Sequence, residues 1–549
     1  MTRAYKMQWV QPIEIHHNID DNFYSVKVDF DTVSGGRSTA IIPRSQIDDP
    51  RGAKRTLAAQ GARMPEDWLE DLRLALIAEG CDIVHSTSIL GWHGRAYLFP
   101  DGAVGHGLRL VPTHPVPARQ CAKGRTKAWR EGLAEACASS SYLTFAVSVA
   151  FAGCLLRPVG QDEGAVFHFI GESSTGKSLA STAAQSVIEK AGRECLRTHD
   201  LTDRALEEQA ARSNDSLLVL DELGRIEGTP AKRLQHAQNL AYKMTGGQGR
   251  QRSNRAVSDF ELRNVQYLLF GLSSGEEPLD GTGIRRRNDG EQVRLIGIPV
   301  PARDEGGIFD REPSGERRAE LARRAELAIC ENYGRPIRRF MKRFLADPEA
   351  EQSAREYVER FMAKAVTAPS PFAERFARKF AAVYAAAMLA AHYKVAPWTK
   401  KAAAAAIRKV HRQAWEIVRP AGSAADDMLA WLRAHAGDPK LFPKVAEGMK
   451  VRPATGKTMF GIRRDISGVS GLALLRDRLP DIVPAWQADG VLASLKARGY
   501  LLPGKEAGRY VRQIRVKGLH PPRRHYVVFD IARIAGPARN TPKKEPDAA

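Results

Sequence analysis

The sequence predicts an α/β protein whose central part forms a parallel β-sheet. Short apolar runs, with helical patterns between most of them, occupy residues 165–170, 194–197, 216–220, 265–270 and 292–298. Strands that alternate with helices favour a parallel sheet covered by helices. A glycine-rich turn follows the first run directly and opens a helical pattern at 177–190. The centre of the chain is therefore expected to be one sheet with a loop-to-helix turn at its edge.

The composition is that of an ordinary globular protein with a large positive charge. The 549 residues include 83 Lys and Arg against 63 Asp and Glu, which gives a formal net charge of +20, and 43% of the residues are hydrophobic. This length suggests three or four domains with sizeable cores. The charge favours a polyanionic partner, with nucleic acid first and an anionic membrane surface second; a basic protein without such a partner is the alternative.

Cysteine spacing and apolar segments favour a cytoplasmic protein without a membrane span. The six cysteines are scattered and form no C-x-x-C pair, which argues against a disulfide framework or a four-ligand zinc site. The first residues lack a signal-peptide pattern. The most apolar segment, residues 141–156, is shorter than the roughly 20 residues of a spanning helix, so we expect a buried helix there.

Composition shifts and breaks divide the chain into five predicted segments. An α+β domain is predicted first, because residues 22–30 alternate like a half-buried strand, residues 65–79 have helical spacing and a Gly91-Trp92-His93 turn precedes a strand at 95–99. The later stretches 315–345 and 372–419 are helical and rich in Ala, Arg, Lys and Glu. The boundaries give an α+β domain at 1–125, an α/β core at 126–305, an α-helical lid at 306–420, a C-terminal module at 421–535 and a disordered tail at 536–549.

The glycine-rich turn has the pattern of a phosphate-binding loop. Residues 171–178 are GESSTGKS and match G-x-x-x-x-G-K-[ST] between a strand and a helix. Backbone N–H groups of such a loop point at the phosphates, Lys177 would reach the β- and γ-phosphates, and the Ser178 hydroxyl would bind Mg²⁺. A flexible Gly/Ser loop is the alternative. The residues expected to bind ATP are Gly171, Ser173, Ser174, Thr175, Gly176, Lys177, Ser178 and Leu179.

Two acids follow a buried strand about 40 residues later. The run LLVL at 217–220 ends in Asp221 and Glu222, at the edge where α/β sheets place their ligands. Asp221 is expected to hold Mg²⁺ and Glu222 to polarise the attacking water. The interval leaves room for one extra strand, as in the branch of P-loop ATPases whose catalytic Glu follows the Walker B Asp. Such an acidic strand end is structural in many proteins, and the loop upstream favours the catalytic interpretation.

The next predicted strand ends in GLSSGE, residues 271–276. Ser273 or Ser274 would contact the γ-phosphate or the water, and an ordinary serine-rich turn is the alternative. The charge that develops on the γ-phosphoryl group also needs a cation, often an arginine from a neighbouring subunit. The candidates are Arg294, Arg286 and Arg287, and a solvated loop or a DNA contact is the alternative for each.

Two basic regions are candidates for DNA contacts. Residues 243–255 contain glycines and basic side chains without an acid, which suits a hairpin that grips phosphates in a pore; the candidates are Lys243, Arg250, Arg252 and Arg255. Residues 488–502 predict an amphipathic helix that is followed by two strand-like runs, the outline of a winged helix. A hairpin for oligomer contacts would look similar. The duplex-binding candidates are Lys496, Arg509, Arg512, Arg515, Lys517, Arg523 and Arg524.

Together these motifs resemble the Cch-type helicases of mobile elements, a family described as a domain of unknown function, DUF927. The resemblance rests on GESSTGKS, LLVLDELGRI, GGQGRQR, SSGE and GEQVRLIGIP and extends over roughly residues 10–420. Members are similar to AAA+ replicative helicases, so the resemblance implies a hexameric ring with ATP sites between subunits.

The resemblance also implies roles for single residues. Lys177 and Ser178 match the Walker A positions, and Asp221 and Glu222 match the Walker B positions. Ser273 or Ser274 falls at sensor 1, Arg294 matches the Arg of a G-x-x-V-R strand, and Arg375 takes the place of a sensor 2 arginine in the lid. The arginine-rich stretch 285–287 departs from the family pattern.

These observations predict an ATP-dependent DNA helicase or translocase that uses ATP and Mg²⁺. It would act as a hexameric ring in the replication of a plasmid, phage or genomic island, with single-stranded DNA in the pore and duplex DNA at the C-terminal module. Replication proteins encoded by the element are further expected partners, and no membrane is expected. The alternative is a non-motor AAA+ switch that loads partners onto DNA, and a basic DNA-binding scaffold with a vestigial nucleotide site is a third hypothesis.

Overall fold

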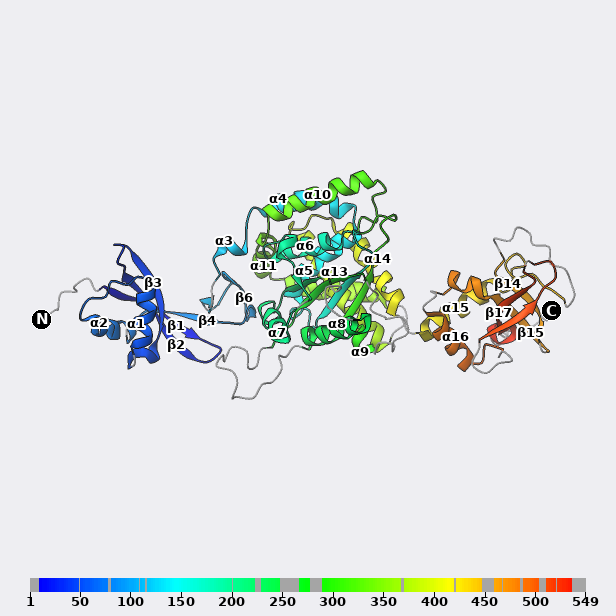
Figure 1. Cartoon of the computed structure of the whole chain (residues 1–549), viewed down its shortest axis with the longest axis horizontal. Helices are drawn as coiled ribbons and strands as arrows, with labels where there is room; N and C mark the ends of the chain where they lie inside the picture. Colours follow the sequence, from blue (N-terminus) through cyan, green and yellow to red (C-terminus); the bar gives the residue numbers. More distant parts are fainter. Residues whose placement is uncertain are drawn as a thin grey trace, which may run out of the picture. The chain divides into compact units, whose positions relative to one another are not determined.

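The computed structural model forms two compact units, Met1–Ile417 and Val418–Ala549, which are coloured from blue to yellow and from yellow to red in Figure 1. The structure describes residues 9–535 except for residues 49, 78–79, 108, 114–115, 200, 223–228, 247–265, 277–288, 367–369, 419–420, 447–458, 467, 484–486, 503–509 and 520. The finer division of the first unit into a domain, a core and a lid stays a prediction.

The first unit begins with a five-stranded sheet of order β3-β2-β1-β4-β8. Its strands are β1 (Val10–Asn18), β2 (Phe23–Asp31), β3 (Arg37–Pro43), β4 (Asp82–Thr87) and β8 (Leu110–Pro112). Helices α1 (Arg51–Ala59) and α2 (Trp68–Leu76) bury the inward residues of β1, β2 and β3 in one core. A smaller sheet of β5 (Gly91–His93), β6 (Ala96–Phe99) and β7 (Gly102–Gly105) follows.

The centre of the first unit is a five-stranded sheet of order β10-β11-β12-β9-β13. Every neighbouring pair in it is parallel, so the predicted parallel sheet is confirmed. Because the strands are parallel, the loops that follow them reach the same edge. The strands are β9 (Ala165–Ile170), β10 (Arg197–Thr198), β11 (Leu217–Asp221), β12 (Phe270–Gly275) and β13 (Leu295–Pro299).

Three predicted strand boundaries of this sheet are wrong. Residues 193–195 form a 3-10 helix, which leaves only two residues for β10, and α9 (Asp289–Gln292) occupies the start of the predicted strand at 292–298. The fourth strand, β12, begins at Phe270 instead of 265, so GLSSG lies inside it. Small residues there are typical of a turn, but a side chain at Gly271 would approach Val166 Cγ2 to 2.9 Å, because β9 and β12 pack closely.

Helices cover this sheet. They are α5 (Ser141–Ala152), α6 (Lys177–Ile188), α7 (Asp203–Arg212) and α8 (Pro230–Thr245), and α4 (Thr126–Ala138) packs on α5. Every residue of α5 is buried, and the Ser140 hydroxyl caps its first turn by accepting the Leu143 N–H. The buried helix predicted for residues 141–156 is thus confirmed. Over the described ranges, no helix combines the length and apolar character needed to cross a membrane.

The predicted helical region follows the sheet and is present. Its helices are α10 (Gly315–Glu331), α11 (Arg335–Ala346), α12 (Ala350–Ala365), α13 (Pro371–His392) and α14 (Lys400–Val418). Pro371 starts α13, a position at which proline costs no helical hydrogen bond. α13 packs along α5 and α12, while α10 packs along α4 and α6, and Figure 1 shows α10 beside α4. α10 is thereby held next to the helix that follows the glycine-rich loop.

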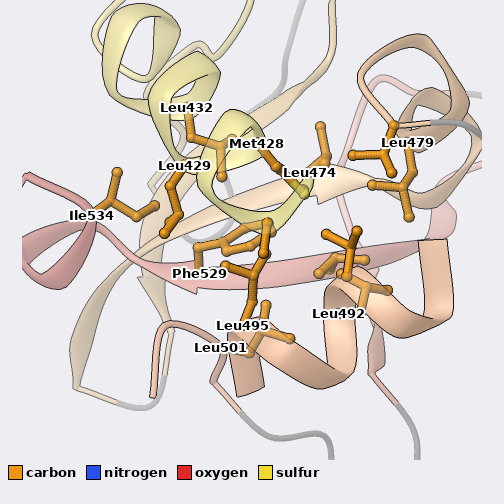
Figure 2. Packing of buried hydrophobic residues seen from close by; sticks show 14 of the residues in the cluster. Met428, Leu429, Leu432, Leu474, Leu479, Leu492, Leu495, Leu501, Phe529 and Ile534 are labelled. Atoms are coloured by element: carbon orange, nitrogen blue, oxygen red, sulfur yellow. The ribbon is translucent and has the colours of Figure 1, made fainter. Parts of the chain in front are cut away.

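The second unit has an antiparallel sheet of order β14-β15-β17-β16 with helices on one face. Figure 2 shows Met428 and Leu429 from α15, Leu492 and Leu495 from α16 and Phe529 from β17 packed into one core. The elements are α15 (Ala421–His435), β14 (Gly461–Ile466), β15 (Val469–Leu475), a 3-10 helix (Arg476–Asp481), α16 (Ala488–Ala497), β16 (Val511–Arg515), β17 (Arg523–Asp530) and α17 (Ile531–Ala535).

Candidate active site

The glycine-rich loop and the ends of β11 and β12 open into one cavity of about 1070 Å³. Of the residues predicted to bind ATP and Mg²⁺, it is lined by Ser173, Ser174, Thr175, Gly176, Lys177, Ser178, Leu179 and Asp221, and also by Glu222 and Ser274. The predicted motifs therefore meet in space, although 43 residues separate Ser178 from Asp221 in the sequence.

The loop has a curved backbone that a second loop supports from outside. Gly176 has φ 92°, a left-handed conformation that favours glycine, and a side chain there would approach Ile308 Cγ1 to 2.7 Å. The Ile308 N–H donates to the Thr175 carbonyl oxygen at 2.9 Å. Gly307 lies so close that a side chain on it would come within 2.4 Å of the same carbonyl oxygen. Residues 307 and 308 thus support the shape of the phosphate loop, although residue 307 lies 130 positions after Lys177 in the sequence.

Lys177 lies inside this curve and is buried. Its ammonium donates to the carbonyl oxygens of Gly171 and Glu172 at 2.7 and 2.6 Å, and within the described ranges its hydrogen bonds go to carbonyl and hydroxyl oxygens instead of a carboxylate. Burial lowers the pKa of Lys177, and the negative charges of Glu276, Asp221 and Glu172 oppose that shift. An entering phosphate would therefore gain a strong cation without breaking an ion pair.

Asp221, Glu222 and Ser274 form a hydrogen-bonded group at the edge of the sheet. The Ser274 hydroxyl donates to Asp221 Oδ1 and accepts the backbone N–H of Glu222 at 3.4 Å. Glu222 is exposed and has φ 61°, a conformation uncommon for residues other than glycine. Asp221 is buried and lines the same cavity as Ser178, and carboxylate and hydroxyl oxygens are the kind of ligands that Mg²⁺ prefers. The residues present thus fit a magnesium nucleotide.

Ser273 faces the other side of the sheet. Its hydroxyl lies 2.9 Å from His168 Nδ1 and 2.7 Å from His199 Nε2, and all three side chains are buried. Since a hydroxyl has one hydrogen to donate, at least one imidazole donates to it. Burial, and to a smaller extent the charge of His236, lowers the pKa of His199 to about 3, so this ring is neutral. The alternation of side chains along β12 thus directs Ser274, but not Ser273, into the cavity.

The two serines are expected to respond differently to alanine. Ser274→Ala removes the contact with Asp221 and is expected to lower kcat for ATP hydrolysis about ten- to hundredfold. Ser273→Ala removes the buried hydroxyl that contacts His168 and His199, and it is expected to cost about 1–3 kcal/mol in the free energy of unfolding, with kcat little changed. ATPase assays and urea denaturation of both variants measure this, and an equal loss of kcat in both would contradict the assignment.

Arg294 and Arg375 lie at the opposite edge of the sheet from the cavity. Both pair with Glu163, which precedes β9, at 2.7 and 3.1 Å, and Lys379 donates to the same carboxylate at 3.2 Å. Burial alone would raise the pKa of Glu163, but the charges of Lys379 and Arg294 and the hydrogen bond from Arg375 lower it. Arg375 therefore lies before the first residue of β9 and away from this cavity, so the sensor 2 contact expected of it stays a prediction.

Several predicted residues lie outside the described residues. These are Arg286 and Arg287 among the candidate arginines, Arg250, Arg252 and Arg255 among the pore candidates, and Arg509 near the C-terminus. Lys243 is described and lies in the last turn of α8, where its carbonyl oxygen accepts the hydroxyl of Tyr267 at 2.6 Å. The pore hairpin therefore stays a prediction.

Sequence patterns miss five charged residues that line the cavity. Arg193, Arg303, Arg318 and Glu326 come from segments without a motif, and Arg193 pairs with Glu326 of α10 at 3.3 Å. Glu276 ends the SSGE motif, which assigns it no role. The Gly306-Gly307 pair, near Arg303, is the one local signal of a close backbone approach. Finding the others requires the tertiary packing of α10 over the loop.

The cations of the second unit divide between two faces of the β16–β17 hairpin. Arg515 lies opposite Arg523 in the ladder, and both are exposed together with Lys517 near the turn. Arg512 and Arg524 belong to the other face, in register with Tyr526 and Ile514. Lys496, on α16, lies 5.7 Å from the ring of Tyr510. The exposed residues of α16 include the acid Asp489 as well as Lys496, so the hairpin offers more positive charge than the helix.

Comparisons with known proteins agree with the resemblance seen in the sequence. Residues 4–259 match the family model described as "Domain of unknown function (DUF927)". Among solved structures the chain is similar to one described as "SCCmec type IV Cch - active helicase", with a TM-score of 0.57 and 17% sequence identity over 97% of this chain and 96% of that chain. No curated protein matches. The resemblance to the DUF927 family is confirmed for residues 4–259, and the chain shares the α/β fold of that helicase structure.

Proposed function

We propose that this chain is an ATPase that unwinds DNA or moves along it. The observation that carries the proposal is the single cavity that Lys177, Ser178, Asp221, Glu222 and Ser274 line together. A curved loop, a cation bonded to neutral oxygens and two acids at a strand end supply what phosphoryl transfer requires: binding, charge neutralisation and a base. Mg²⁺ bound at Ser178 and Asp221 would neutralise charge on the β- and γ-phosphates.

In the proposed reaction, water attacks the γ-phosphorus of ATP and ADP leaves. Glu222 would accept the proton of that water, and its carboxylate is exposed where water can reach it. The bond from the γ-phosphorus to the bridging oxygen breaks as the bond to the water oxygen forms, and the products are ADP and inorganic phosphate. Ser274 would hold Asp221 and the Glu222 backbone in place, while Lys177 balances the charge that moves toward the leaving group.

We propose a hexameric ring with one ATP site at each subunit boundary. The distance of Arg294 from its own cavity supports this, since a cation at the opposite edge serves a phosphate only from a neighbouring subunit. Arg286 and Arg287 remain the other candidates for that cation. The similarity to a structure described as an SCCmec Cch helicase, together with the DUF927 match, supports a role in replicating a mobile element such as a genomic island.

We propose that DNA contacts both units. Single-stranded DNA would pass Lys243 and the following loop in the pore, and duplex DNA would bind the second unit. The order β15-β17-β16, with α16 before the β16–β17 hairpin, resembles the outline of a winged helix, and this likeness supports the proposed duplex-binding role.

The double variant Arg515→Ala/Arg523→Ala is expected to weaken duplex binding. Each lost phosphate contact reduces the slope of log K against log salt by about 0.9, so the slope should fall by nearly 2. Fluorescence anisotropy with a labelled duplex at several salt concentrations measures it. The control is Arg478→Ala, whose charge is paired with Asp481 at 3.0 Å. An unchanged slope in the double variant would contradict this binding surface.

Strand displacement on a forked duplex tests the motor. With ATP and Mg²⁺ we expect unwinding together with ATP hydrolysis that single-stranded DNA stimulates. Stimulated hydrolysis without unwinding would be consistent with translocation along DNA and would contradict the helicase activity. Slow hydrolysis that DNA does not stimulate would instead favour the non-motor switch, an alternative that the same cavity permits.

A further inference from the structure

Helix α10 carries four arginines, and three of them are neutralised by carboxylates. Arg317 and Arg324 both pair with Glu135 of α4, at 2.5 and 2.9 Å, and Arg323 pairs with Glu320 at 3.0 Å. These pairs lie at the surface, where each contributes little to stability. The two pairs with Glu135 join α10 to α4, whereas the Arg323–Glu320 pair lies within α10.

Arg318 is the fourth arginine, and it lines the cavity. It is half-buried, and in the described part of the chain its guanidinium donates to the carbonyl oxygen of Glu312, at 3.2 Å, instead of a carboxylate. One stripe of α10 with helical spacing forms this wall: Gly315, Arg318, Ala319, Ala322 and Glu326. A partly desolvated guanidinium with one neutral partner is a binding group for an anion.

The loop beside Arg318 connects it to the phosphate loop. Gly306 has φ 108°, and a side chain there would approach Arg318 Nη1 to 3.0 Å. The next residue, Gly307, contacts Thr175 of the phosphate loop so closely that a side chain would not fit. Two consecutive glycines therefore let the guanidinium approach the same cavity wall that Thr175 and Lys177 form.

The other arginines of the cavity are less suited to this role. Arg193 is paired with Glu326, and Arg303 is exposed to solvent. Of the three arginines that line the described cavity, Arg318 alone combines partial burial with a helix whose other arginines are held by ion pairs. Its planar fork of donors matches two oxygens of a phosphate group.

We propose that Arg318 binds the phosphate chain of the nucleotide in its own subunit, opposite Lys177. This inference rests on the proposed ATPase function and names a binding residue that no sequence motif indicates. Lys177 would hold the phosphates from the loop, and Arg318 would hold them from α10, so that bound nucleotide joins the sheet to the helical region.

Equilibrium titration of a fluorescent ATP analogue, with competition by ADP and by adenosine, tests the proposal in the full-length chain. Arg318→Ala is expected to weaken ATP and ADP binding about ten- to hundredfold, the range of a charge-assisted hydrogen bond, and to leave adenosine competition unchanged. Arg318→Lys should restore part of the loss. Arg317→Ala, the adjacent control, should bind ATP like the unchanged protein.

Each outcome decides between clear alternatives. If the unchanged chain fails to bind ATP, the proposed function fails as well. If it binds ATP and Arg318→Ala binds equally well, only this inference is overturned. Equal losses for ATP and adenosine, or an equal loss in Arg317→Ala, would also overturn it, because they indicate a contact with the base or a general disturbance of α10. Thermal melting of each variant checks folding.

Discussion

Lys177→Ala is expected to abolish measurable ATP hydrolysis, with a loss of at least about a thousandfold in kcat/KM. The ammonium lies inside the loop and bonds only to neutral oxygens in the described part of the chain, so its whole charge is available to the phosphates. Its loss removes a binding contact and also the stabilisation of charge on the leaving group, and both effects lower kcat/KM. A coupled assay for ADP release with Mg²⁺ and single-stranded DNA measures it.

Lys190→Ala is the matched control for this variant. Lys190 follows the same helix, α6, and is exposed and distant from the loop, so its loss changes the net charge equally without touching the cavity. Thermal melting should show that both variants fold. Residual hydrolysis in Lys177→Ala near the level of the control would contradict the placement of the γ-phosphate at this loop.

The loop and the acids can be predicted from the sequence because their signals are local. The glycines of 171–176 and the apolar run before Asp221 act through the backbone of their own segments, and the structure has them as expected at the ends of β9 and β11. Parallel pairing then brings them to one edge without further information, since the carboxyl ends of parallel strands meet there.

The choice between Ser273 and Ser274 depends on strand boundaries that do not follow from the sequence alone. Because GLSSG has no branched or aromatic residue after Leu272, it is typical of a turn, and in a turn both hydroxyls are equivalent. Inside a strand the two hydroxyls point to opposite faces of the sheet. The buried His168 and His199 contact the Ser273 hydroxyl on one face, so Ser274 is the serine that faces the cavity. That information lies in β9 and after β10, far from the serines in sequence.

The arginines show the same limit more strongly. The position of Arg375 before Phe380 favours a nucleotide contact, yet its partner Glu163 is 212 residues away and lies at the other edge of the sheet. Arg318 stands in a run of charged residues that has no motif, and only the packing of α10 on α4 and α6 turns it toward the cavity. Charge in a sequence indicates a surface helix, whereas its partner is a property of the fold.

Glu222→Gln is expected to separate ATP binding from hydrolysis. The amide keeps the size of the side chain and its backbone N–H still donates to Ser274, so the cavity should keep its shape. Without a carboxylate to accept the proton of the attacking water, kcat should fall about a hundred- to ten-thousandfold, while the Kd for ATP changes little. Single-turnover hydrolysis together with ATP titration measures both quantities.

Glu276→Gln is the decisive control, because Glu276 is another acid that lines this cavity and the sequence motifs assign it no role. Glu276 follows the end of β12, and its charge acts on Lys177, so its amide variant is expected to change ATP affinity more than turnover. If Glu276→Gln loses hydrolysis and Glu222→Gln retains it, Glu276 is the base and the role of Glu222 is wrong.

A Glu222→Gln chain that binds ATP without hydrolysing it should also hold its DNA in a stable complex, since a motor that cannot complete the cycle stops in the ATP state. Dissociation of that complex on exchange into ADP would connect the hydrolysis step at Glu222 directly to movement on DNA.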